Sequence, residues 1–68
     1  MSKFMRERAT EHTLNQIKTR QEKVYVAPDY ESYEIATRIL EENKQLGIVQ
    51  SYEYSIRGCF YVEYSQKI

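Results

Sequence analysis

The sequence has 68 residues, with ten basic and ten acidic side chains and a formal net charge of zero. A chain of this length forms at most one domain, and it buries only about 60 % of the surface that its unfolded form exposes. Such small domains depend on a disulfide, a metal or a partner for part of their stability. Because its net charge is zero, the chain also lacks the strongly basic character of most proteins that bind polyanions.

A single cysteine and a single histidine exclude several kinds of site. Cys59 has no second cysteine with which to form an intramolecular disulfide, and a structural zinc ion usually needs four ligands held close together. A Cys–His hydrolase needs its nucleophile and base within hydrogen-bonding reach, whereas Cys59 and His12 lie in different predicted elements. No glycine-rich phosphate loop is present, since Gly47 and Gly58 are the only glycines. The sequence therefore predicts a protein that is not an enzyme and that binds no metal or cofactor.

The sequence also gives an expectation about location. No run approaches the roughly 18 apolar residues that a membrane span needs, and the charges within the first ten residues argue against a secretory signal peptide. A lone cysteine fits a reducing compartment better than secretion. Together these features predict a cytoplasmic protein.

Residues 1–22 are predicted to form a basic N-terminal helix. Residues 3–21 contain neither proline nor glycine, and residues 1–23 carry six basic and three acidic side chains. The apolar residues scatter around the helical wheel and form no single stripe, so this weakly amphipathic helix is expected to bury little. An isolated helix of this kind is marginal in water, so it either frays or is held by a partner.

Residues 23–68 are predicted to form a β-α-β-β domain. Residues 23–27 alternate as a strand, which Pro28 ends. A helix follows over residues 30–46, with Asp29 or Ser32 as its N-cap and Gly47 as its left-handed C-cap. The apolar residues of this helix recur at the 3.6-residue period and share one side of the wheel; they are Ile35, Ala36, Ile39, Leu40 and Leu46.

Residues 48–56 and 59–66 alternate between apolar and polar, which predicts a hairpin that turns at Arg57 and Gly58. The predicted fold is therefore a small α+β domain of order α-β-α-β-β, with a three-stranded mixed sheet and one main helix packed on one face. The pattern leaves open whether the first strand lies beside the second or the third. The predicted core is Val24, Val26, Ile35, Ala36, Ile39, Leu40, Leu46, Ile48, Tyr52, Tyr54, Ile56, Phe60, Val62 and Tyr64.

The second face of the predicted sheet carries Tyr25, Val49, Cys59 and Tyr61. One helix covers only one face of a sheet, so this face is left for another element. We expect either the N-terminal helix or a partner to cover it. A second copy of the chain is the expected partner, because the core of one copy is small.

Tyrosine is the unusual residue of this composition, with seven copies and no tryptophan. The candidate protein-binding residues are an acidic, tyrosine-rich stretch, Tyr30, Glu31, Tyr33 and Glu34, together with two sheet tyrosines, Tyr25 and Tyr61. Aromatic and acidic side chains together suit a surface that meets a basic protein. The sequence therefore predicts a non-catalytic interaction module, a small regulator or inhibitor that binds another protein and forms a homodimer.

A nucleic-acid-binding protein is the alternative. Single-stranded bases stack on sheet aromatics beside basic side chains that contact phosphates. The candidate residues for this reading are Tyr25, Tyr61, Arg57, Arg6 and Arg8. Glu53 and Glu63 are expected on the same face as the two tyrosines, and their charges weaken this alternative.

Overall fold

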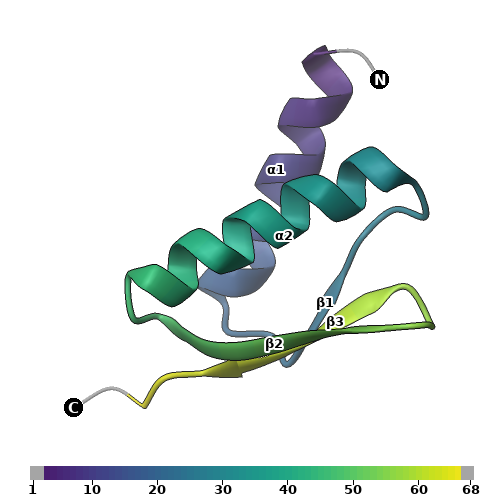
Figure 1. Ribbon diagram of the computed structural model, residues 1–68. Helices are drawn as coiled ribbons and strands as arrows, with labels where there is room; N and C mark the ends of the chain where they lie inside the picture. The colour runs from purple at the N-terminus through teal and green to yellow at the C-terminus, as the bar shows by residue number, and fades with distance from the viewer. Residues whose placement is uncertain (1–2, 67–68) are drawn as a thin grey trace.

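The computed structural model of the protein describes residues 3–66, with side chains from residue 6 onward. Five elements follow one another: α1 (Lys3–Lys18), β1 (Lys23–Tyr25), α2 (Tyr30–Gln45), β2 (Val49–Ser55) and β3 (Cys59–Tyr64). Both helices lie on one face of a three-stranded sheet, and the other face is left uncovered by any helix (Figure 1). The fold is thus α+β, as predicted. Neither helix within the described residues combines the length and apolar character needed to cross a membrane.

Helix α2 is defined at both ends by local sequence. The Asp29 carboxylate accepts hydrogen bonds from the Ser32 backbone N–H at 2.8 Å and from the Ser32 hydroxyl at 3.0 Å, so Asp29 is the N-cap. At the other end, the N–H of Ile48 donates to the Asn43 carbonyl at 2.9 Å, and Gly47 has a φ of 83°. This is the Schellman arrangement, so the predicted C-cap at Gly47 is confirmed.

The prediction of a mixed sheet is wrong. The strand order is β1-β3-β2, and β3 pairs antiparallel with both of its neighbours. Strands β1 and β2 run in the same direction but do not touch, because the crossover through α2 leaves a gap of one strand between them. The tight hairpin then folds β3 back into that gap, so no parallel pair is formed.

A β-bulge changes which residues of β2 face the core. The register of β2 against β3 shifts between Val49 and Ser51, which leaves Gln50 as the extra residue. Val49 is therefore buried, with 1 % of its surface exposed, whereas Ile48 is 39 % exposed. The sequence predicted the opposite for this pair, because uninterrupted alternation puts Ile48 on the core face.

Three other predicted core residues are exposed. Leu46 follows the last turn of α2 and Ile56 lies in the hairpin loop, and both point away from the core. Tyr54 lies on the core face opposite Phe60, but β2 is an edge strand with a strand neighbour on one side, so 42 % of the Tyr54 surface stays exposed. The remaining predicted residues are buried or pack against the core: Val24, Val26, Ile35, Ala36, Ile39, Leu40, Tyr52, Phe60, Val62 and Tyr64.

Helix α1 packs on its own domain. Thr13 and Ile17 are buried, and Ile17 joins the same hydrophobic core as α2 and the sheet. The Gln16 side chain fastens the helix to the outer edge of β1, since it donates to the Tyr25 carbonyl at 2.9 Å and accepts from the Tyr25 N–H at 2.8 Å. One carboxamide thus takes the place of a neighbouring strand and closes that edge of the sheet.

The end of α1 is held by Arg20, which has an unusual backbone. Its φ of 55° is in the left-handed region that glycine usually occupies in a helix C-cap. Its side chain explains why arginine stands there: the guanidinium donates to the Ser65 carbonyl at 2.6 Å and lies 5.1 Å from the centre of the Tyr64 ring. The Tyr64 hydroxyl in turn donates to the Gln21 carbonyl at 2.7 Å. These contacts fix the end of α1 to the end of β3.

We expect Gln16→Ala to lower the free energy of unfolding by about 1–2 kcal/mol, because it removes both hydrogen bonds to Tyr25. Asn15→Ala is the matched control, since Asn15 is an exposed neighbour on the same helix. Urea unfolding followed by circular dichroism measures both. Equal stability of the two variants would contradict the structural role of Gln16.

We expect Gly47→Ala to lower the free energy of unfolding by about 1 kcal/mol through backbone conformation alone. An added Cβ would meet no atom within 4 Å, so a steric clash contributes nothing. Gly47→Asn should cost less, because asparagine tolerates the left-handed region. The same urea experiment would refute this explanation if the alanine and asparagine variants were equally stable.

Candidate functional site

The acidic, tyrosine-rich stretch divides between two sides of α2. Tyr30 and Tyr33 lie close together, with ring centres 6.5 Å apart, and Tyr33 meets Tyr54 of β2 edge to face at 4.8 Å. Glu31 instead faces α1, where one of its carboxylate oxygens lies 3.6 Å from the Arg6 guanidinium. The four residues predicted to act together therefore do not form one surface.

A groove runs between α2 and β2 on the side of Tyr33. Its volume is about 580 Å³, and we call it the tyrosine groove. Positions three and four apart in a helix share a side, so one side of α2 supplies most of its lining, and β2 supplies the rest. The lining residues are Tyr33, Glu34, Thr37, Arg38, Glu41 and Tyr52.

The aromatic part of this groove is joined to the core. The buried ring of Phe60 lies 5.6 Å from Tyr33 in a stacked arrangement, 4.9 Å from Tyr54 and 6.1 Å from Tyr52. Rings held in this way keep their orientation without a ligand. A partner that packs on them therefore loses little of its binding free energy to ordering side chains.

The residues that line the tyrosine groove carry one more negative than positive charge, since Glu34 and Glu41 supply two carboxylates and Arg38 one guanidinium. The ammonium of Lys44, which is not part of the lining, lies 6.0 Å from the centre of the Tyr52 ring. Burial raises the pKa of the Tyr52 phenol, and the nearby Glu41 carboxylate raises it further. The Tyr52 hydroxyl therefore stays neutral and remains able to donate a hydrogen bond.

The tyrosine groove lies beside an open edge of the sheet. β2 is at one end of the strand order and β3 is its only strand partner, so within residues 3–66 its outer edge pairs with no strand. The opposite edge, on β1, is closed by Gln16. The two edges of this sheet thus differ in whether they can accept another strand.

A second surface is formed by the sheet face that bears no helix, which we call the open sheet face. Residues directly opposite one another on neighbouring strands point to the same side, so this face carries Lys23, Tyr25, Ser51, Glu53, Ser55, Cys59, Tyr61 and Glu63. Tyr25 is 56 % exposed and Tyr61 is 43 % exposed. Of the two covers expected for this face, the N-terminal helix is excluded, because α1 lies beside α2 on the other face. Val49, which the sequence predicted on the open sheet face, lies on the core face of the sheet instead.

The candidate nucleic-acid residues do not come together. Arg6 and Arg8 lie on the N-terminal half of α1, on the helix side of the sheet, and Arg57 lies in the hairpin loop (Figure 1). Tyr25 and Tyr61 lie on the open sheet face. They share that face with Glu53 and Glu63, as expected, and Glu63 accepts a hydrogen bond from the Ser51 hydroxyl at 2.9 Å.

Cys59 and His12 are also far from forming a site. His12 is exposed on α1, whereas Cys59 is buried on the open side of the central strand, so the sheet separates them. Among the residues that the structure describes, no group of three His, Cys, Asp or Glu side chains is placed to hold a metal ion.

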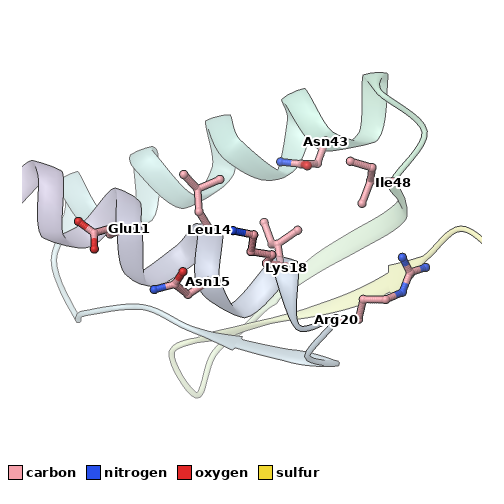
Figure 2. A pocket seen from close by; sticks show the side chains of 8 residues that line it. Glu11, Leu14, Asn15, Lys18, Arg20, Asn43 and Ile48 are labelled. Carbon is pink, nitrogen blue, oxygen red and sulfur yellow. The ribbon is translucent and has the colours of Figure 1, made fainter.

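A second groove, which the sequence did not reveal, lies between α1 and the C-terminal end of α2. Figure 2 shows Leu14 and Ile48 reaching into the space between these elements, with Lys18 and Arg20 nearby. Its volume is about 600 Å³, and Leu14 is 44 % exposed. The weak pattern of α1 gave no signal for this groove, because it depends on how α1 docks.

Known proteins offer no guide to these surfaces. No protein family, curated protein or solved structure matches the chain.

We expect Glu41→Gln to lower the pKa of the Tyr52 phenol while leaving it above the ordinary value for tyrosine, because burial is the larger cause of the shift. Carbon NMR of the tyrosine rings during an alkaline titration measures this. Glu42→Gln is the control, since Glu42 is exposed outside the groove. An unchanged Tyr52 titration in the Glu41 variant would show that this carboxylate does not face the phenol.

Proposed function

We propose that the protein is a non-catalytic interaction protein, a small regulator or inhibitor that binds an extended segment of another protein in the tyrosine groove. The observation that carries this proposal is that the groove lies directly beside the unpaired edge of β2. A helix and an open sheet edge that flank one groove form the arrangement used in strand addition, where a peptide becomes one more strand of the sheet.

Each half of the site supplies a different part of the binding. The backbone of β2 offers hydrogen bonds to any extended segment, and these give affinity with little dependence on sequence. Successive side chains of a strand point to opposite faces, so every second side chain of the added segment points toward α2 and the groove. The groove residues then select among those side chains.

The chemistry of the groove indicates an arginine or lysine in the bound segment. Glu34 and Glu41 provide carboxylates for a cationic head, and the rings of Tyr33 and Tyr52 provide flat apolar surface for its stem. An arginine side chain combines both contacts, because it pairs with carboxylates and stacks on aromatic faces. By holding such a segment, the protein would keep it from its usual contacts, and regulation would follow from this competition.

We expect the double variant Glu34→Lys/Glu41→Lys to bind the partner with an affinity at least about 10-fold lower, because the two substitutions remove the charge-assisted contacts of both carboxylates. The measurement is site-specific photocrosslinking in nuclease-treated lysate of the source cells, with the photoreactive residue at Thr37 in the tyrosine groove and, separately, at Asn15 in the second groove. One protein should crosslink from Thr37 and not from Asn15.

Glu42→Lys is the matched control, because it reverses a charge on the same helix outside the groove. It should leave the crosslink from Thr37 unchanged. Crosslinking from Asn15 alone, or equal crosslinking by the double variant and the control, would contradict binding in the tyrosine groove.

Nucleic-acid binding through the open sheet face is the second candidate, and the exposure of Tyr25 and Tyr61 on one face favours it. If this candidate holds, affinity for a single-stranded oligonucleotide falls steeply as salt is raised, and Tyr61→Ala weakens it. Among the described residues of the open sheet face, Lys23 is the one basic side chain, and Glu53 and Glu63 lie on the same face, which makes this the weaker of the two proposals.

A further inference from the structure

The open sheet face carries charges of opposite sign on its two outer strands, β1 and β2. Tyr61 of β3 pairs with Lys23 of β1 on one side and with Glu53 of β2 on the other, so these three residues form one row across the sheet. The Lys23 ammonium lies 5.9 Å from the centre of the Tyr61 ring. The row thus runs from a cation, across an aromatic ring, to an anion.

In the next row the residues of β1 and β2 differ in size and not in charge. Tyr25, Cys59 and Ser55 lie side by side, so the large ring is on β1 and the small hydroxyl on β2. Cys59, between them, is only 4 % exposed although it lies on the open side. The face is therefore bulky and cationic along β1, and small and anionic along β2.

A two-fold rotation axis parallel to the strands, placed above β3, turns this asymmetry into complementarity. The rotation exchanges the positions of β1 and β2 and leaves each row where it is. Lys23 of one copy then lies opposite Glu53 of the second copy, and the same pair forms again on the other side of the axis. Tyr61 faces its own equivalent across the axis, and Tyr25 faces Ser55.

We propose that the open sheet face is the interface of a symmetric homodimer in which Lys23 of each copy pairs with Glu53 of the other. Two sheets that pack face to face keep their strands roughly aligned, as this axis requires. A two-fold interface needs one surface that complements itself, and the row through Tyr61 has that property. This interface uses neither the tyrosine groove nor the outer edge of β2, so it is independent of the proposed function.

The charges also identify a position that weakens the dimer. Glu63 lies on β3, close to the proposed axis, so it faces Glu63 of the second copy with the same charge. The Ser51 hydroxyl holds its carboxylate in place at 2.9 Å. The dimer is therefore weak, and Glu63→Gln strengthens it.

The test is sedimentation velocity of the purified protein and its charge variants over a range of concentrations. The wild type should change from monomer to dimer as concentration rises. Lys23→Glu and Glu53→Lys should each remain monomeric, since each places like charges opposite one another twice. An equimolar mixture of these two variants should dimerise again, because every opposed pair in the mixed dimer then has opposite charge. The double swap Lys23→Glu/Glu53→Lys should also restore the dimer.

Two controls make the result specific to this face. Glu42→Lys changes the charge on the helix side by the same amount as Glu53→Lys and should leave the dimer intact. Circular dichroism of each variant alone establishes that loss of the dimer is not loss of the fold. Glu63→Gln should shift the transition to lower concentration, so a folded variant with tighter association supports the proposed axis.

Three outcomes would overturn the proposal. The wild type could remain monomeric up to about 1 mM, which would exclude a dimer with a Kd of about 1 mM or tighter. Both single variants could dimerise as well as the wild type, which would place the contact on another surface. The mixture could stay monomeric while the wild type dimerises, which would exclude the reciprocal pairing of Lys23 and Glu53. Glu34→Lys/Glu41→Lys should leave the dimer unchanged, so failure of this proposal is distinguishable from failure of the groove proposal.

Discussion

The packing of the Phe60 ring against its aromatic neighbours is the interaction on which the rest of the structure depends. It is buried on the central strand, beneath α2, and it packs on three tyrosines that come from α2 and β2. In a domain this small, one ring of that size is a large share of the core. The same ring also sets the positions of Tyr33 and Tyr52 in the tyrosine groove. Stability and the binding surface are therefore coupled through a single side chain, and a change at Phe60 would alter both.

The asymmetry of the sheet gives each surface its own character. Gln16 closes the edge along β1 by bonding to the backbone of Tyr25, and this contact also secures α1, whose other buried contacts are few. The edge along β2 carries a bulge at Gln50 and no strand partner among the described residues. Placing both helices on one face leaves the other face to Tyr25 and Tyr61. One small chain therefore presents an open edge and an open face that point in different directions.

Local features of the sequence predicted much of this fold. The 3.6-residue period, the cap at Asp29 and the left-handed Gly47 are encoded within one or two helical turns, so α2 was predictable. The strand order, the bulge at Gln50 and the docking of α1 depend on contacts between distant residues, and the local pattern carries no record of them. Tyr33 and Glu34 are predictable as candidates because they belong to one acidic, tyrosine-rich stretch. Tyr52 and Glu41 are distant in sequence, and they line the same groove only because β2 lies beside α2 in the fold.

The central position of β3 has a consequence for how the chain folds during synthesis. β3 is made after β1, α2 and β2, yet among residues 3–66 it is the strand that pairs with both of the others. Until residues 59–64 have been translated, β1 and β2 have no strand with which to pair, and the apolar side of α2 has no sheet to cover. The nascent chain therefore cannot accumulate a partly native sheet, and folding of the sheet must wait for β3. A ribosome that stalls within the hairpin would release a fragment with its apolar side chains exposed, and such a fragment is a natural target for chaperones and proteases.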